Sequence, residues 1–387
     1  MDIIMYISNL LVYLLLILFS GLVLVDSFIS TAVNEKQRAW HTRLLNNMNK
    51  GLVLAVLLAL FLQLIQWVEQ FGGNQLTVLL LEGATGRVWL ALMVISTISL
   101  FVVKKYIQAR LLAALLLLLV ESMNGHPATS SFLVLVDFVH LASISIWVGG
   151  IVYFILQIKE GKDAVIAFIQ PFTKLLWLTI ALASVSGVVL TVFILPDASY
   201  LFYTSWGQLL LIKVAAVLLA LWFGYKAKTY VVANENVSRP RALLYEFATM
   251  AVVIALAAII SSISPMPSFD RAINVHQMGD ELHYTVKLSP NAPGPNSLSV
   301  TLWSLKEEGE IANVQLSIVA KDKPRTSERL FELDSIELED HIEFPGFNES
   351  RFVLENMRLP YPTKWQAEVV ISFVSGQQRQ FSFEFEN

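Results

Sequence analysis

NGHPATSSFLVLVDFVHLASISIWVGGIVYF, residues 124–154, is the stretch that decides the fold of this chain. It is apolar enough to cross a bilayer, yet Asp137 and His140 lie inside the apolar run and His126 lies just before it. Ionisable side chains at membrane depth are costly and are usually functional. We therefore expect a membrane helix that carries the functional groups. The rest of the chain would support this helix or deliver a ligand to it.

The composition of the whole chain is that of an integral membrane protein. Of its 387 residues, 55% are hydrophobic and 15% are charged, and the mean hydropathy is +0.60. The first apolar run, residues 3–29, has no basic segment before it and no small-residue cleavage site, so we expect it to stay as a helix. Cysteine is absent, which excludes disulfides, thiolate metal sites and cysteine-linked haem.

Eight apolar runs are long enough to cross a hydrocarbon core of roughly 30 Å, which needs about 20 helical residues. They lie at about 4–29, 51–71, 86–103, 107–123, 131–158, 172–195, 207–226 and 242–263. Basic residues mark alternate loops as cytoplasmic, and the loops between these hold only Arg87. The basic residues of the four predicted inner loops are Lys36, Arg38, Arg43 and Lys50; Lys104, Lys105 and Arg110; Lys159, Lys162 and Lys174; and Lys226, Lys228, Arg239 and Arg241. The sequence therefore predicts an eight-helix bundle in the cell membrane with both termini outside.

The periodicity changes after residue 265. Short segments of alternating apolar and polar residues follow, separated by turn-forming sequences such as PNAPGP at 290–295. This pattern predicts a small antiparallel β-sandwich of the immunoglobulin type, with about seven strands. We expect two domains, a transmembrane domain at 1–265 and an extracellular sandwich at 266–387.

The predicted helix at 131–158 presents Asp137, His140 and Trp147 on one face, because they are separated by three and seven residues. His140 lies roughly 13 Å below the start of this helix, close to the middle of the bilayer. Met123 and Glu121 accompany His126 at the predicted outer mouth; together these imidazole, thioether and carboxylate groups suit copper. In the alternative interpretation, Asp137 and His140 only bond to each other or to a neighbouring helix and hold the bundle together.

Several other residues have both a functional and a structural interpretation. Lys213, about six residues into the seventh predicted span, either reaches the outer surface or neutralises a carboxylate such as Asp137 or Glu121. Glu246 is expected to form an ion pair at the membrane surface with one of the two arginines shortly before it. The paired glycines after Trp147 favour close helix packing. These glycines are Gly149 and Gly150.

The C-terminal domain has its own candidate metal ligands. His276 and His283 lie near Met266 and Met278 in the sequence, and the four would capture metal before it enters the membrane. Surface residues of an ordinary sandwich would look the same. No nucleotide-binding or metalloprotease motif is present and nothing indicates nucleic-acid binding, so we expect a non-enzymatic membrane protein.

The stretch GHPATSSFLVLVDFVHLASISIWVGGI resembles the signature of the copper resistance D (CopD) family, in which a histidine precedes a helix reading Asp-x-x-His and then Trp-x-Gly-Gly. The likeness extends to TGRVWL at 85–90, to residues 186–217 and to residues 241–246. The segment LSPNAPGPNSLSVTLW looks like the extracellular β-domain of Gram-positive relatives. The resemblance implies copper handling, with copper import across the cytoplasmic membrane as the expected activity.

By match of motif, the resemblance implies that copper passes His126, then Asp137 and His140. It leaves Trp147, the glycine pair and Lys213 as signature positions without an assigned role. Many relatives carry an N-terminal copper-binding CopC domain, whereas this sequence starts directly in its first apolar run. We therefore expect copper to arrive from a separate CopC-like protein, from the C-terminal domain or as free ions.

Two other functions remain open from the residues alone. A membrane haem protein would also place histidines on bundle helices, although His41 and His126 are the only other histidines in the first 265 residues. A copper sensor or delivery factor for a partner oxidase would bind metal through its C-terminal domain without transporting it.

Overall fold

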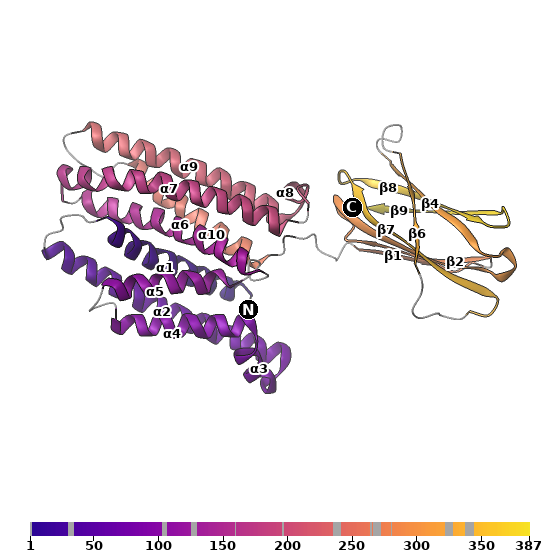
Figure 1. Ribbon diagram of the computed structural model, residues 1–387, viewed down its shortest axis with the longest axis horizontal. Helices are drawn as coiled ribbons and strands as arrows, with labels where there is room; N and C mark the ends of the chain where they lie inside the picture. Colours follow the sequence, from indigo (N-terminus) through magenta and orange to yellow (C-terminus); the bar gives the residue numbers. More distant parts are fainter. Residues whose placement is uncertain are drawn as a thin grey trace. The chain divides into compact units, whose positions relative to one another are not determined.

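The computed structural model describes residues 2–29, 35–102, 107–124, 130–158, 160–195, 197–234, 241–263, 265, 272–279, 281–321, 328–336 and 344–387 (Figure 1). The chain forms two compact units. The first consists of Met1–Ile194 and Leu209–Ile263, and the second of Leu195–Gln208 and Ser264–Asn387. The first unit is helical, and the second contains the strands.

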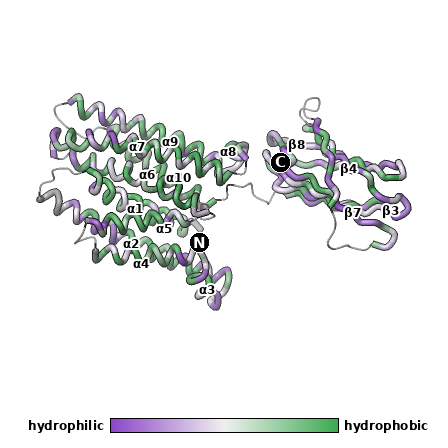
Figure 2. The backbone as a smooth tube through the Cα atoms, in the orientation of Figure 1, coloured by the Kyte–Doolittle hydropathy of each residue, from purple (hydrophilic) through white to green (hydrophobic). Residues whose placement is uncertain are grey.

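The helical unit is built from long apolar helices with short connections. Their bounds are α1 Asp2–Phe28, α2 Glu35–Phe71, α4 Ala84–Val102, α5 Ile107–Ser122, α6 Ser131–Ile158, α7 Lys162–Ile194, α9 Ser205–Ala233 and α10 Arg241–Ser262, with a short 3₁₀ turn η1 (Gly73–Gln75) and a short helix α3 (Leu76–Leu81) before α4. Hydrophobic residues cover most of the length of the long helices (Figure 2). Large apolar side chains such as Trp177 and Val192 are more than 60% exposed on the protein alone, as expected for surfaces that face lipid.

Seven of the described helices are long and apolar enough to cross a membrane. The prediction of a multi-pass membrane bundle is therefore confirmed. The remaining helix of the predicted eight is α5, whose 16 residues fall short of the usual spanning length. Its buried residues Ala114, Leu117 and Leu118 nevertheless belong to the same hydrophobic core as the seven longer helices.

Helix α6 occupies the centre of this unit, because it contacts α1, α5, α7 and α10. Glycine residues permit its closest helix contacts. A Cβ atom built on Gly149 would overlap the backbone of Gly21 in α1, and one built on Gly150 would overlap the ring of Phe172 in α7. The glycine pair thus lets α1 and α7 approach α6 on two sides, which is the close approach that small residues permit in membranes.

The second unit contains two antiparallel sheets that share one hydrophobic core. The five-stranded sheet has the order β1-β2-β3-β7-β6 and the four-stranded sheet the order β5-β4-β8-β9. The strands are β1 Ile273–Gln277, β2 Leu282–Ser289, β3 Gly294–Leu305, β4 Ile311–Ala320, β5 Arg329–Glu332, β6 Asp334–Ile336, β7 Phe347–Leu359, β8 Lys364–Phe373 and β9 Gln378–Glu386, with a 3₁₀ turn η4 at Lys306–Glu308. The described chain therefore has nine strands where the alternation predicted about seven. The difference is explained by β5 and β6, whose four and three residues are too short to show a periodic pattern.

The segment Leu195–Gln208, which connects α7 to α9, belongs to the sandwich unit. It contains the short helix α8 (Tyr200–Tyr203). The Tyr200 side chain is only 4% exposed, and its hydroxyl donates a hydrogen bond of 3.3 Å to the Pro295 carbonyl. A Cβ on Gly294 would lie 2.6 Å from the Tyr200 ring, so the absence of a side chain at Gly294 makes room for the tyrosine.

An ion pair adds to this contact. The Arg358 guanidinium in β7 lies 2.9 Å from the Asp197 carboxylate, whose side chain is 11% exposed. Hydrogen bonds from the Ser199 hydroxyl and backbone amide, followed by the charge of Arg358, hold the pKa of Asp197 below its ordinary value. The carboxylate therefore stays charged and bonded at neutral pH, and the connection is tied to the sandwich through backbone, ring and charge contacts.

We predict that Gly149→Ala destabilises the helical unit, because α1 and α6 must separate to admit the new methyl group. Overpacking of this kind typically costs about 1–3 kcal/mol. The thermal unfolding midpoint of the purified protein in detergent should fall by several degrees. Gly51→Ala is the matched control, because a Cβ there lies 3.6 Å from its nearest neighbour, the Leu15 side chain. Equal midpoints for the two variants would contradict the proposed importance of the backbone contact.

Candidate functional site

His140 is held by helix α7. Its Nδ1 atom lies 2.9 Å from the Ala183 carbonyl oxygen and 3.0 Å from the Ser186 hydroxyl. A carbonyl oxygen only accepts hydrogen bonds, so Nδ1 carries the proton and Nε2 carries the free lone pair. This is the arrangement found in metal-binding histidines, whose second ring nitrogen is fixed by an outer partner. Within α7, the Ser186 hydroxyl in turn donates to the Leu182 carbonyl, at 2.6 Å.

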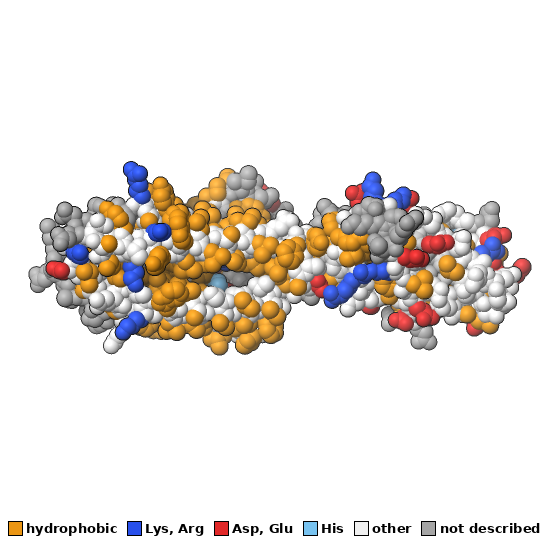
Figure 3. All heavy atoms as spheres, turned by 90° about the horizontal axis from the view of Figure 1, so that it is seen from above, with side chains coloured by type: hydrophobic (Ala, Val, Ile, Leu, Met, Phe, Trp, Pro, Cys, Tyr) orange, Lys and Arg blue, Asp and Glu red, His pale blue; other side chains and the backbone are white. Residues whose placement is uncertain are grey.

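Glycine next to this serine makes room for the imidazole. A Cβ on Gly187 would lie 3.2 Å from Cε1 of His140, which is closer than ordinary van der Waals contact. The Ser186-Gly187 pair therefore combines a hydrogen-bond partner with space for the ring. Figure 3 shows a histidine side chain that is visible from the surface between hydrophobic side chains of the helical unit. The His140 side chain is half-buried.

Asp137, one turn before His140, lies near charged residues from two other helices. It interacts electrostatically with Glu121 at the end of α5 and with Lys213 in α9. Tyr13 of α1 also interacts electrostatically with both carboxylates. The Glu121 side chain is hydrogen-bonded to Asn124. The structure thus brings together three charged residues that the sequence could only propose as neighbours.

A third carboxylate lies further along the same face of α6. The indole nitrogen of Trp147 donates to Oε1 of Glu246 in α10 at 3.4 Å, and the two residues are only 4% and 5% exposed. Gly224 of α9 lies against this carboxylate, since a Cβ there would be 2.6 Å from Oε1. Asp137, His140 and Trp147 therefore mark three successive levels, separated along the helix axis by about 4.5 Å and about 10 Å.

The prediction that Glu246 forms an ion pair is wrong for Arg241, the arginine that the structure describes. Arg241 is exposed, and Glu246 makes no ion pair within the part of the chain that the structure describes. Five residues on a helix correspond to a rotation of about 140°, so the two side chains point to different sides of α10. The second arginine, Arg239, lies outside the described residues.

A separate polar cluster lies on the opposite side of α6 and was not predicted. The hydroxyl of Tyr153, a residue only 5% exposed, donates to Asp26 of α1 at 2.9 Å. The same hydroxyl lies 2.7 Å from Nε2 of His41 in α2. In the sequence, Tyr153 is 127 positions from Asp26 and 112 positions from His41. Sequence spacing therefore gave no signal that they meet.

The other predicted site residues have different surroundings. His126 and Met266 lie outside the described residues. Met123 is 44% exposed just after α5. His276 and His283 lie on neighbouring strands of the sandwich, and Met278 follows the first of these strands with 65% exposure. Among the described residues, no group of three or more His, Asp or Glu side chains is arranged to hold a metal ion.

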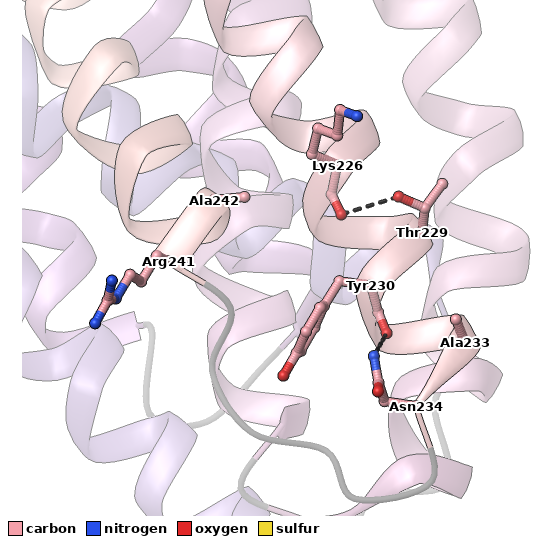
Figure 4. A pocket seen from close by; sticks show the side chains of 7 residues that line it. All are labelled: Lys226, Thr229, Tyr230, Ala233, Asn234, Arg241 and Ala242. Carbon is pink, nitrogen blue, oxygen red and sulfur yellow. Dashed lines mark hydrogen bonds between the residues drawn. The ribbon is translucent and has the colours of Figure 1, made fainter.

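A pocket of about 750 Å³ lies between the end of α9 and the start of α10 (Figure 4). Its described lining residues are Lys226, Thr229, Tyr230, Ala233, Asn234, Arg241 and Ala242. None of these is Asp, Glu, His or Met, so the pocket lacks the ligand types that the candidate site on α6 offers.

The comparisons with known proteins agree with a copper-related family. Residues 166–264 match the family model described as copper resistance protein D. This range includes the partners of His140 in α7 together with Lys213 and Glu246, whereas Asp137 and His140 themselves precede it.

One curated relative is the copper transport protein CutJ of Bacillus subtilis (strain 168). It is 29% identical over 317 residues, which are 73% of this chain and 57% of the relative. The chain therefore spans little more than half the length of this relative. Among solved structures, alkylpurine DNA glycosylase AlkC of Pseudomonas fluorescens is 12% identical, covering 77% of this chain and 91% of that chain, but its TM-score of 0.20 is too low to support a statement about fold.

We predict that Lys213 and Asp137 are energetically coupled. Lys213→Met leaves two carboxylates close together without this cation and should lower the unfolding midpoint in detergent. Adding Asp137→Asn to Lys213→Met should recover part of the loss, with a coupling of about 0.5–3 kcal/mol in a double-mutant cycle. The matched control is Lys226→Met, which removes an exposed lysine from the same helix. Additive effects of the two changes would contradict the interaction.

Proposed function

We propose, from the premise that this chain belongs to the CopD family, that it imports copper by passing the ion along one face of α6. The family and the relationship to a copper transport protein support copper transport in general. The single observation that carries the proposed path is the fixed orientation of His140, whose Nδ1 is bonded to α7 while Nε2 stays available.

The order of the groups along α6 supports the proposed path. Glu121 and Asp137 place two neighbouring carboxyl groups where a cation would meet them before it reaches the imidazole. His140 then offers nitrogen ligation, and Glu246 lies at the next level beside Trp147. With His126 at the entrance, an ion would meet the groups in the order His126, Asp137, His140. The proposed activity moves an ion without a chemical reaction, so we propose a transporter rather than an enzyme.

The direction of import depends on the orientation in the membrane. We propose eight spans, with α5 as the short one, and with both termini and the sandwich outside the cell. The alternation of basic loops supports this topology. Copper would be supplied by a CopC-like protein or by free ions and would leave on the cytoplasmic side.

The haem alternative has a specific requirement. Two axial histidines must face each other across one cofactor. His41 is bonded to Tyr153 on the side of α6 opposite to His140, so the structure gives no support for pairing His41 with His140. An absorption spectrum without a haem band would remove this alternative.

We predict that His140→Ala lowers copper uptake into proteoliposomes by at least about 10-fold, because the available imidazole nitrogen is lost. Ser186→Ala should lower uptake by a smaller factor, because the ring keeps its bond to the Ala183 carbonyl. Uptake is measured with Cu(I) and with Cu(II) separately.

Thr179→Val is the matched control for these variants. Its hydroxyl lies in the same helix as Ser186 but bonds only to the Leu176 carbonyl of that helix in the described structure. Unchanged uptake by a folded His140→Ala protein would rule out the path. The sensor alternative would be favoured if wild-type protein bound copper without any uptake.

The topology is testable because the chain has no cysteine. We predict that single cysteines at Glu82, Met123 and Glu355 react with an impermeant maleimide on intact cells. Cysteines at Gln108, Glu160 and Asn234 should react only after permeabilisation. Met123 and Gln108 lie near opposite ends of α5, so labelling of both from one side would contradict the eighth span. A reversed pattern overall would contradict the proposed orientation.

A further inference from the structure

The outer face of the five-stranded sheet carries an aromatic cluster that contains two histidines. In the register of these strands, His276 faces Thr285 and His283 faces Trp303. Tyr284 and Leu302, which alternate with these residues, are part of the sandwich core. His276, His283 and Trp303 therefore project from the opposite face of the sheet.

The rings of this cluster are in contact. The His276 and Trp303 ring centroids are 6.4 Å apart, and His283 lies 4.5 Å from Phe347 in an edge-on arrangement. Phe344 lies 6.2 Å from His283 and 5.9 Å from Trp303. Trp303 is only 7% exposed although it points away from the core. The cluster thus forms a small apolar patch around two imidazoles.

The two imidazoles differ in how their nitrogens are used. Nδ1 of His276 lies 2.8 Å from the Thr285 hydroxyl. This contact fixes the ring and does not involve Nε2. Nδ1 of His283 is buried and has no hydrogen-bond partner among the described residues. A buried polar atom without a partner is unfavourable and requires an explanation. A bound ligand that uses imidazole lone pairs would provide one.

A thioether side chain, Met278, follows the end of β1 directly. β1 ends at Gln277, which pairs with Tyr284. The alternation of β1, continued by one residue beyond its end, would put Met278 on the same face as His276. The Met278 side chain is 65% exposed and therefore accessible. Glu281, an acidic residue between the two strands, is already paired with Arg379 at 2.5 Å.

We propose that His276, Met278 and His283 form a Cu(I) site on the outer face of the sandwich. Two imidazoles and one thioether are ligands that favour copper in its reduced state. Thr285 orients one imidazole as an outer partner, and the aromatic side chains limit access of water. The choice of copper among soft metals rests on the proposed transport function, whereas the ligand set rests on the sandwich alone.

The test is Cu(I) binding to purified full-length protein in detergent, under ascorbate and in competition with a chromophoric Cu(I) chelator. The double variant H276A/H283A should lose one equivalent of Cu(I) relative to wild type. Asn274→Ala is the matched control, because it changes an exposed residue on the same strand and face. Undiminished Cu(I) stoichiometry and affinity in the folded double variant would overturn the site.

A second variant covers the case in which the double variant does not fold. Met278→Leu changes an exposed side chain and should weaken Cu(I) binding at this site at least about 10-fold while the unfolding midpoint stays unchanged. Wild-type affinity in this variant would overturn the ligand set. Binding of Cu(II) but not Cu(I) to the wild-type sandwich residues would likewise overturn the proposal.

The two proposals fail in different ways. His140→Ala should lower uptake at least about 10-fold, as stated above, but keep the equivalent bound by the sandwich. If wild-type protein shows no uptake and H276A/H283A still loses one equivalent, transport is wrong and the sandwich site stands. If uptake depends on His140 but no variant of the sandwich changes Cu(I) binding, only the sandwich site is wrong.

Discussion

The backbone contact between Gly21 of α1 and Gly149 of α6 is the constraint on which the helical unit depends. On a helix with about 100° per residue, Tyr153 lies roughly 40° from Gly149 and therefore faces α1, where it meets Asp26. His140 lies about 180° from Gly149 and therefore faces away from α1, toward α7. One close crossing thus separates two polar clusters on opposite sides of the same helix.

Buried ionisable side chains gather near the side of α6 that faces α7 and α10. Glu121, Asp137 and Glu246 lie near or along this side, and Lys213 approaches the first two. Carboxylates at membrane depth lose hydration, and each needs a positive charge or a hydrogen-bond donor to offset that loss. A passing metal ion adds positive charge where the protein has more carboxylates than nearby cations. An ion on the proposed path would therefore meet carboxyl oxygens at the levels next to the His140 imidazole.

Much of the membrane part was predictable because hydrophobic periodicity is a local signal. The expected span at 131–158 agrees with α6, and the shared face of Asp137, His140 and Trp147 follows from their spacing. The partner of each residue was not predictable, because periodicity gives a direction and not the helix that lies there. Ser186 is 46 positions from His140, and Glu246 was assigned to nearby arginines although helical rotation directs it elsewhere. Nearness in sequence was misleading for Glu246 because it ignores that rotation.

The connection between α7 and α9 belongs to the sandwich unit, although both helices continue into the helical unit. Asp197 and Tyr200 are bonded to sandwich residues, so contacts with the sandwich constrain this connection at two points. Helix α7, which carries Ser186, runs into the connection, and α9, which carries Lys213, begins within it. The connection is therefore an ordered part of the sandwich unit rather than a free loop, because an ion pair and a hydrogen bond hold it there.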